Sequence, residues 1–501
     1  MSRQPNILLI MTDQQRADTI GALGNPHIQT PAQDRLVREG TSFTSAYCAS
    51  PVCQASRCSL LLGEYAHTTG CVSNLPMPQE RTSLMEMLRG AGYQTHGVGK
   101  MHFGPDSRYL WGFESRDYSE EGGMRDGDDF CEFLKANGYE HIVDPSGMRS
   151  EFYYVPQPSQ LPARLHNTQW SGDRSLEFLQ RRDRSRPFFL WSSYIKPHPP
   201  FENPVPWSRL YRPVEMPFPH LPLGWEEMTT FWNRVQNRYK YRDQGFDGNL
   251  VRLIRAAYFA CVSFVDYQIG RLLSYLEEQG ELDNTLVIHT ADHGELLGDF
   301  GSWGKRSILD AAARVPCLVR YPERFAAGQV CETPASLVDI LPTCLSLAGI
   351  DTQPQHAGRD LAQLAAGDCD REGVICQFQQ GDRGLYGYIT SGFKYVYSVA
   401  DDREWLFPRV AGEPEMRDLC GNPAYMKVLA QHREALIARF RADGYELPLD
   451  GDGWRKHPRL EVPSTPDAWQ LYQDGGRIDD LFPPGYRPQV DPFGGLPVRG
   501  I

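Results

Sequence analysis

A cysteine near the N-terminus of the chain has the neighbours of a reactive nucleophile. The stretch SPVCQASRCSLLLGEYAHTTG covers residues 50–70, and in it Cys53 opens a helix-like run that also contains Arg57. A thiol at a helix N-terminus beside a guanidinium is reactive on electrostatic grounds, because the helix dipole and the positive charge both stabilise the thiolate. Taken alone, these residues predict a thiol nucleophile at position 53.

Two carboxylates that are far apart in the sequence each follow a predicted buried strand. Asp13 ends the apolar run Asn6–Thr12, and Asp292 ends the run Leu286–Ala291. In open α/β sheets, the polar groups at the carboxyl ends of the strands gather along one edge, where ligands bind. We therefore expect the two carboxylates to meet in space.

Strand-like and helix-like segments alternate through the first part of the chain. The predicted strands are apolar on both faces, which is typical of a parallel sheet covered by helices on both sides. The alternation predicts an α/β layer architecture. Strands are expected at Asn6–Thr12, Tyr93–Gly99, Pro187–Tyr194, Leu286–Ala291 and Val315–Tyr321, and helices at Pro31–Arg38, Ser83–Arg89, Asp173–Arg182 and Leu250–Glu278.

The pattern changes after this α/β region, and we predict three parts: a catalytic domain at 1–370, a small α+β subdomain at 371–445 and an extended tail at 446–501. The tail is rich in Pro, Gly and Asp and is expected to wrap its own domain or to grip a neighbouring subunit of a homo-oligomer. In the subdomain, strands are expected at Val374–Phe378, Tyr386–Ser391 and Lys394–Val399, and a helix at Met426–Phe440.

Residues 195–247 have little periodicity and are expected to form a long surface excursion, which is often functional in a compact domain. Trp207, Trp225 and Trp232 lie in it. Such aromatic rings could form a cage for a quaternary ammonium group, or they could simply pack.

The composition excludes several classes of protein. The 501 residues carry 51 basic and 63 acidic side chains, a net charge of -12, so there is no basic field to hold nucleic acid or an anionic membrane. The apolar run Ile7–Met11 is too short for the core of a signal peptide, and no apolar stretch approaches the length of a membrane span. We therefore expect a cytoplasmic protein without membrane contact.

The 12 cysteines show no disulfide framework, and most are expected to be buried free thiols. A zinc site made of Cys48, Cys53, Cys58 and Cys71 is conceivable, but the sequence has no CxxC pair to support it.

Six segments together resemble the sulfatase family. CQASRCSLLLG resembles the sulfatase signature C-x-[PA]-S-R-x-x-x-L-x-G, in which the cysteine is oxidised after translation to formylglycine. The others, in family order, are PNILLIMTDQQRAD, TPAQDRLVREGTSFTSAY, GVGKMHFG, KPHPPF and TADHGELLGDFGSWGK. This resemblance, which spans residues 5 to about 320, implies an alkaline-phosphatase-like sandwich with a large, mostly parallel central sheet flanked by helices.

The resemblance also implies a metal site. One divalent ion, Ca²⁺ or Mn²⁺ with Mg²⁺ as a further candidate, would be bound by Asp13, Gln14, Asp292, His293 and the formylglycine made from Cys53. Such mostly hard donors suit these ions. Many sulfatases have Asp-Asp and Asp-Asn where this chain has Asp13-Gln14 and Asp292-His293, a pattern similar to that of bacterial phosphonate monoester hydrolases and choline sulfatases.

The same resemblance implies a mechanism. The hydrated formylglycine attacks sulfur, and a formylglycine-generating enzyme is the partner during maturation. It implies that Arg57 and Lys100 hold the nucleophile and the sulfuryl oxygens and that His102 acts as a base. It also implies that His198 and Lys305 contact the ester and leaving oxygen and that Asn74 contacts the substrate.

Three substrates are compatible with this pattern. The first is a small sulfate monoester of the arylsulfatase type, the second is choline sulfate, and the third is a phosphonate monoester or phosphodiester. Lys100 and His102 favour sulfate, because phosphonate hydrolases typically lack these two residues. A binding or scaffold protein with this fold is expected to have lost some of the charged groups, whereas this chain retains them.

Overall fold

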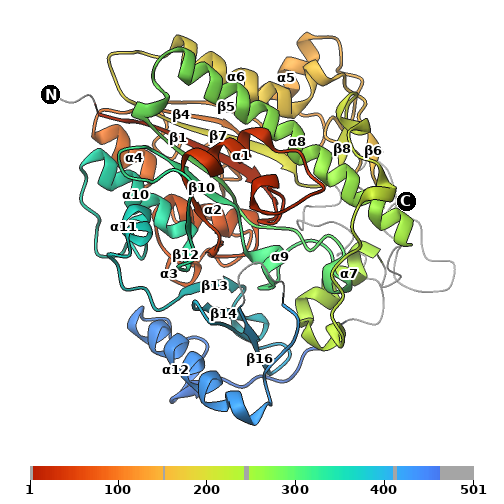
Figure 1. Cartoon of the computed structure of the whole chain (residues 1–501), viewed down its shortest axis with the longest axis vertical. Coiled ribbons are helices and arrows are strands. Elements are labelled where there is room, and N and C mark those ends of the chain that lie inside the picture. Colours follow the sequence, from red (N-terminus) through yellow and green to blue (C-terminus); the bar gives the residue numbers. More distant parts are fainter. Residues whose placement is uncertain (1–3, 150–152, 242–246, 410–414, 463–501) are drawn as a thin grey trace.

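An eight-stranded sheet runs through the centre of the protein (Figure 1). The computed structural model describes residues 4–149, 153–241, 247–409 and 415–462. The strand order is β11-β2-β10-β9-β1-β7-β4-β5, and neighbouring strands are parallel except where β10 pairs with β2 and β9. The strands are β1 (Asn6–Asp13), β2 (Thr41–Phe43), β4 (Gln94–Gly99), β5 (Ser115–Tyr118), β7 (Phe188–Pro197), β9 (Thr285–Ala291), β10 (Cys317–Arg320) and β11 (Gln329–Cys331). The prediction of a mostly parallel sheet is confirmed.

Helices cover both faces of the sheet, as the doubly apolar strands predict. In β1, Ile7 and Leu9 belong to the core on one face, and Leu8 and Ile10 belong to the core on the other. The helices packed on the face of Leu8 are α1 (Pro31–Glu39), α6 (Asn167–Arg181) and α8 (Gly248–Glu278). Those on the face of Ile7 are α2 (Cys53–Leu62), α4 (Leu84–Gly90), α10 (Ile340–Ala348) and α11 (Leu361–Ala366).

Shorter elements fill the connections between these layers. The paired two-residue strands are β3 (Ala46–Tyr47) with β12 (Ala335–Ser336) and β6 (Gln157–Pro158) with β8 (Glu202–Asn203). The remaining helices of the connections are α3 (Ala66–Thr69), α5 (Asp129–Ala136), α7 (Phe231–Tyr241) and α9 (Asp310–Ala313).

Helix α8 corrects the expectation that no segment has the length of a membrane span. Within the described part of the chain, this 31-residue helix is long and apolar enough to cross a membrane by length and composition. However, 67% of its most apolar window is buried inside the protein, where it packs on α1, α6 and β7. Its composition is therefore accounted for by its place as the long core helix of this layer.

The predicted surface excursion at 195–247 is wrong for its first residues. Strand β7 continues to Pro197, and Lys196, His198 and Phe201 are all buried. Because β7 lies between β1 and β4, the polar residues at its end lie at the interior edge of the sheet. Residues 242–246 lie outside the described residues.

Two of the tryptophans of this segment have separate packing partners. Trp207 stacks on Phe264 with ring centroids 4.6 Å apart, and Trp232 meets Phe378 edge-on at 4.9 Å. These rings therefore take part in packing and do not face one another across a common cage.

A second, antiparallel sheet follows the main domain and lies at one end of the molecule (Figure 1). The predicted strands and helix are present, and one further strand, β16, was not predicted. Helix α12 covers this sheet, and Trp454 stacks on Tyr397 at 4.8 Å. The elements are β13 (Val374–Phe378), β14 (Leu385–Ile389), β15 (Phe393–Ser398), β16 (Arg403–Pro408), α12 (Met426–Ala442), β17 (Leu449–Asp450) and β18 (Gly453–Trp454). The boundaries at 370 and 445 stay predictions, and the tail beyond residue 462 lies outside the described residues.

A buried ion cluster joins the second sheet to the main domain, and it yields a prediction about stability. Lys394 Nζ on β15 lies 2.6 Å from Asp310 of α9 and also contacts Glu415. We expect Lys394→Met to lower the free energy of unfolding by about 3–5 kcal/mol, because it leaves the buried Glu415 without its cation and leaves Asp310 with Arg314 alone. Denaturant unfolding measures the loss. Lys456→Met, which removes an exposed pair with Asp402, is the control and should cost under about 1 kcal/mol. Equal losses in the two variants would contradict the prediction.

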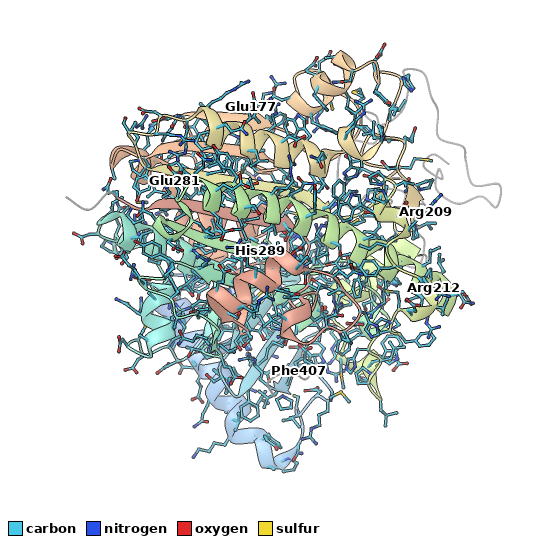
Figure 2. All side chains as sticks on the ribbon, turned by 45° about the horizontal axis from the view of Figure 1, so that its top comes forward. Glu177, Arg209, Arg212, Glu281, His289 and Phe407 are labelled. Carbon is cyan, nitrogen blue, oxygen red and sulfur yellow. The ribbon has the colours of Figure 1, made fainter. Side chains whose placement is uncertain are left out.

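His289 predicts a pH dependence of stability. It lies on β9 near the middle of the molecule (Figure 2), fully buried, with Nε2 3.1 Å from Gln33 Oε1. Burial lowers the pKa of His289 to about 4. In the unfolded chain the pKa is about 6.5, so the unfolded state binds more protons between these values. The stability contributed by the neutral imidazole is therefore complete above about pH 6.5 and declines as the pH falls towards about 4.

The magnitude follows from the shift. Between pH 7 and pH 5 the loss from this one group is about 2 kcal/mol. His289→Gln removes the titrating group, so its free energy of unfolding should fall less over the same interval than that of the wild type. The same pH dependence in both proteins, measured by urea unfolding, would show that His289 does not contribute.

Candidate active site

The carboxyl ends of β1 and β9 meet, as the sequence predicts. The two strands pair in parallel register from Asn6 opposite Thr285 to Thr12 opposite Ala291, which places Asp13 and Asp292 side by side. The Gln14 amide N donates to Asp292 Oδ1 at 3.0 Å. Both carboxylates are fully buried, so the sheet edge holds two acidic groups away from water.

Cys53 is the first residue of α2, as predicted, and it faces these carboxylates. Its Sγ lies 3.7 Å from Asp13 Oδ1 and 3.2 Å from His293 Nε2. His293 Nδ1 lies 2.9 Å from the Gly294 carbonyl O, which only accepts, so Nδ1 carries the proton and Nε2 is turned to the site. Ligand atoms of Asp13, Cys53, Asp292 and His293 all lie within 4.8 Å of one another.

These groups fit a divalent ion. Two carboxylates, an imidazole nitrogen and the side-chain oxygen of Gln14 are a mostly hard donor set, which suits Ca²⁺, Mn²⁺ or Mg²⁺. Asp13 and Asp292 are held ionised for such a role. Burial opposes this, but Lys100 and Lys305 hold the pKa of Asp13 below its ordinary value. The charges of His293 and Arg57 similarly lower the pKa of Asp292.

Three buried cations surround the carboxylates and Cys53. Lys100 Nζ lies 2.6 Å from Asp13 Oδ2 and 3.9 Å from Cys53 Sγ. Lys305 Nζ lies 2.9 Å from the same sulfur atom. Arg57, which the family resemblance assigns to the nucleophile, donates through Nε to Asp292 Oδ2 at 2.8 Å. In this structure Arg57 therefore orients a carboxylate of the proposed metal site.

A glycine places Lys100 at the site. Gly99 ends β4 with a φ of 80°, and a Cβ there would lie 2.0 Å from the carbonyl O of Ser193 on β7. Only glycine allows this close approach of the two strands. The Lys100 carbonyl then accepts from Arg57 Nη1 and from Ser193 Oγ, at 2.5 Å in each case, which ties α2 to both strands.

Glu121 is a residue of the site that sequence reasoning missed. Its Oε2 lies 2.6 Å from Lys100 Nζ and 3.2 Å from His198 Nδ1. Burial opposes its ionisation, but the charges of Lys100 and Arg149 hold the pKa of Glu121 well below its ordinary value. Glu121 follows β5 in a stretch without a motif, so no sequence signal marks it.

His198 lies beside the site, with a ring nitrogen within 4.8 Å of ligand atoms of Asp13 and Glu121. Nδ1 donates to the Pro199 carbonyl at 2.7 Å. Nε2 is buried and has no hydrogen-bond partner among the described residues. Burial lowers the pKa of His198 well below its ordinary value, so the ring is neutral here.

His102 and Asn74 lie close to the main groups. The His102 backbone N donates to Glu120 Oε1 at 2.8 Å, two residues after Lys100. Asn74 Oδ1 lies 3.4 Å from the backbone N of Gln54, next to Cys53. Their roles stay predictions.

The cysteines do not gather into a zinc site. All 12 are free and ten are buried, which confirms the prediction of buried thiols. In the described part of the chain, the possible metal-binding groups of His, Cys, Asp and Glu include Cys53 but none of Cys48, Cys58 and Cys71.

The fold and the site together define a class of protein: an α/β enzyme with a divalent-metal donor set at the carboxyl edge of its mostly parallel sheet and a thiol beside it. The family model described as Sulfatase matches residues 5–350, and the one described as N-sulphoglucosamine sulphohydrolase, C-terminal, matches residues 298–442. The chain belongs to the sulfatase family of the alkaline phosphatase superfamily and is a sulfuric ester hydrolase.

Similar proteins cover nearly the whole chain. The arylsulfatase of Clostridium perfringens is 30% identical in an alignment of 475 residues that covers 88% of this chain and 96% of that protein. The choline-sulfatase of Rhizobium meliloti is 29% identical over 84% of this chain and 78% of its own length. Among solved structures, the phosphonate monoester hydrolase from Silicibacter pomeroyi superposes with a TM-score of 0.75 at 26% identity, covering 91% of this chain and 100% of that one.

The donor set predicts that a divalent ion stabilises the folded protein. Mn²⁺ or Ca²⁺ at 100 times its dissociation constant should add about 2.7 kcal/mol to the free energy of unfolding of chelator-treated protein. Asp292→Asn should remove most of this gain, because it takes one charged ligand away. Asp283→Asn, with a side chain that is 81% exposed, is the control. Thermal unfolding with and without the ion measures the effect, and no ion-dependent shift in the wild type contradicts it.

Proposed function

We propose that this protein is a metal-dependent sulfatase of the arylsulfatase type, which hydrolyses a small sulfate monoester by means of a formylglycine made from Cys53. One observation carries the proposal. Cys53 Sγ lies at the start of α2 with His293 Nε2 at 3.2 Å on the metal side and Lys305 Nζ at 2.9 Å. A nucleophile at position 53 thus touches both a metal ligand and a cation.

Asp13, Gln14, Asp292 and His293 would hold the divalent ion together with residue 53. When present, the ion and the formylglycine would supply a nucleophilic hydroxyl at neutral pH. Two other requirements fall to the protein itself. The sulfuryl oxygens need positive charge near them, and the leaving oxygen needs a proton.

Lys100 and Lys305 would supply the positive charge near the sulfuryl oxygens, because their ammonium nitrogens lie 3.9 and 2.9 Å from Cys53 Sγ. His198 is the candidate for the second requirement, because a ring nitrogen lies within 4.8 Å of ligand atoms of Asp13 and Glu121 and its Nε2 is buried without a partner among the described residues. To donate, the ring must first take up a proton at Nε2. Glu121, 3.2 Å from Nδ1, favours the imidazolium that results.

Two alternative substrates come from the relatives. A choline-sulfatase and a phosphonate monoester hydrolase are similar to this chain. The buried ammonium of Lys100 beside residue 53 favours sulfate over phosphonate, because phosphonate hydrolases typically lack this lysine. Trp207 and Trp232 have separate packing partners and give choline no support.

Three further features belong to the proposal. The stretch CQASR around Cys53 is the support for a formylglycine-generating enzyme as the maturation partner. A homo-oligomer and a cytoplasmic location stay predictions from the sequence alone.

The test combines the mass of residue 53 with a comparison of substrates. Protein made in a host with a formylglycine-generating system should show Cys53 with H₂S exchanged for O, while Cys58 in the same helix stays a thiol. The value of kcat/KM should be at least about tenfold higher for an aryl sulfate than for an aryl phosphonate, a phosphate diester or choline sulfate. Cys53→Ala should abolish turnover. Full activity with Cys53 entirely unconverted would contradict the mechanism, and a preference for another substrate would replace the arylsulfatase proposal.

A further inference from the structure

The side-chain amide of Gln14 lies between a buried cation and a buried carboxylate. Its Oε1 accepts from Lys305 Nζ at 3.0 Å, and its Nε2 donates to Glu295 Oε2. An ammonium group can only donate and a carboxylate can only accept. Both neighbours therefore favour the same orientation of the amide, in which its oxygen lies on the side of Lys305 and Cys53.

Glu295 is itself held firmly. It is fully buried, and its Oε1 accepts from the backbone N of Leu297 at 2.9 Å and from that of Gly304. Its Oε2 accepts from Tyr154 OH at 2.8 Å and from Gln14. These four uncharged donors match the lone-pair sites of a carboxylate. The charge of Glu295 is thus anchored one hydrogen bond away from the metal donor set.

The backbone of Gln14 is fixed as well. Its φ is 70°, the left-handed region that a side chain such as glutamine rarely adopts. The conformation is held because its N donates to Asp292 Oδ1 at 3.0 Å and its carbonyl accepts from Tyr258 OH at 2.7 Å. Because the backbone is held on both sides, the remaining variable is which end of the side-chain amide, the oxygen or the nitrogen, faces the site.

We infer that Glu295 is a positioning residue that turns the oxygen of the Gln14 amide, and not its nitrogen, towards the metal. The inference deepens the proposed function and rests on its metal site. Where many sulfatases carry a second aspartate after the first strand, this chain has a neutral ligand, and the second negative charge lies behind it on Glu295. The hydrogen bond to that charge polarises the amide and makes Oε1 a better donor to a cation.

Glu295→Gln tests the inference because it should reverse the amide. The backbone N–H groups of Leu297 and Gly304 can only donate, so they retain the oxygen of the introduced side chain. Its NH₂ group then faces Gln14, which must turn its own oxygen away from the metal. Isothermal titration of the chelator-treated full chain with Mn²⁺ and with Ca²⁺ should show a loss of about 10–100-fold in affinity.

The double variant Gln14→Glu with Glu295→Gln should recover the affinity. The carboxylate introduced at position 14 can accept from the NH₂ group at position 295 through one oxygen and present the other to the metal. We expect binding within about threefold of the wild type or tighter. Tyr154→Phe is the matched control, because it removes the other donor to Glu295 Oε2 and a 3.5 Å contact of Gln14 Nε2 with the hydroxyl, but leaves the Glu295 carboxylate that fixes the orientation of the amide. It should bind the ions within about threefold of the wild type.

Each outcome of these titrations either supports or overturns the inference. Wild-type affinity in Glu295→Gln overturns the inference, and so does a folded double variant that binds no better than Glu295→Gln. If Glu295→Gln does not fold, as judged by circular dichroism, the double variant is compared with Gln14→Ala, and equal affinities overturn the inference. A wild-type protein that binds neither ion overturns the metal site of the proposed function and the inference with it, whereas a wild type that binds while the variants do not differ leaves the metal site standing.

Discussion

The pairing of β1 with β9 forces two buried carboxylates together, and much of the surrounding structure offsets the electrostatic cost. Asp13 and Asp292 have no water to solvate them, and each raises the free energy of the other in ionised form. Two like charges at such a short distance in a protein interior repel each other by several kcal/mol or more. Three buried cations offset this repulsion: Lys100 directly after β4, Arg57 in α2 and Lys305 in the loop after β9. The site therefore exists only when the whole domain is folded.

In the proposed mechanism the same cations would also serve the chemistry. Lys100 and Lys305 stabilise the carboxylates of the donor set and also lie beside the sulfur atom of Cys53. If the carboxylates held a divalent ion, as proposed, the positive charge of these lysines would remain available to the group on residue 53 and to whatever is bound to it. Glu121 limits this field on the side of Lys100, because its carboxylate lies 2.6 Å from the ammonium nitrogen. Charge balance and catalysis are thus properties of one network.

The sequence predicted the parts of this network that have a periodic or motif signal. The strands that end at Asp13 and Asp292 are long apolar runs, and Cys53 stands in a specific motif, so their meeting could be inferred. Glu121 could not, because it belongs to no periodic segment and gains its role only from tertiary contacts with Lys100 and His198.

The errors in the fold have similar causes. The edge strands β5 and β11, and β2 next to β11, have three or four residues, too few for a period to be recognised. The KPHPPF stretch reads as a polar, proline-rich loop, yet it is buried because it continues a central strand into the interior edge of the sheet. Local composition gave the wrong answer there, since burial was decided by the position of β7 between β1 and β4.

The neutral donors of the site have a consequence for its chemistry. With an amide at position 14 and an imidazole at 293, only Asp13 and Asp292 of the proposed protein ligands would bring full negative charge directly to the ion. An ion with fewer anionic ligands keeps more of its positive charge for the oxygen nucleophile that it activates. Glu295 restores a negative charge behind Gln14, at a distance where it strengthens a neutral donor without adding an anionic ligand. The chain therefore separates two tasks that a second aspartate would combine: holding the ion in place and setting how strongly it draws electrons.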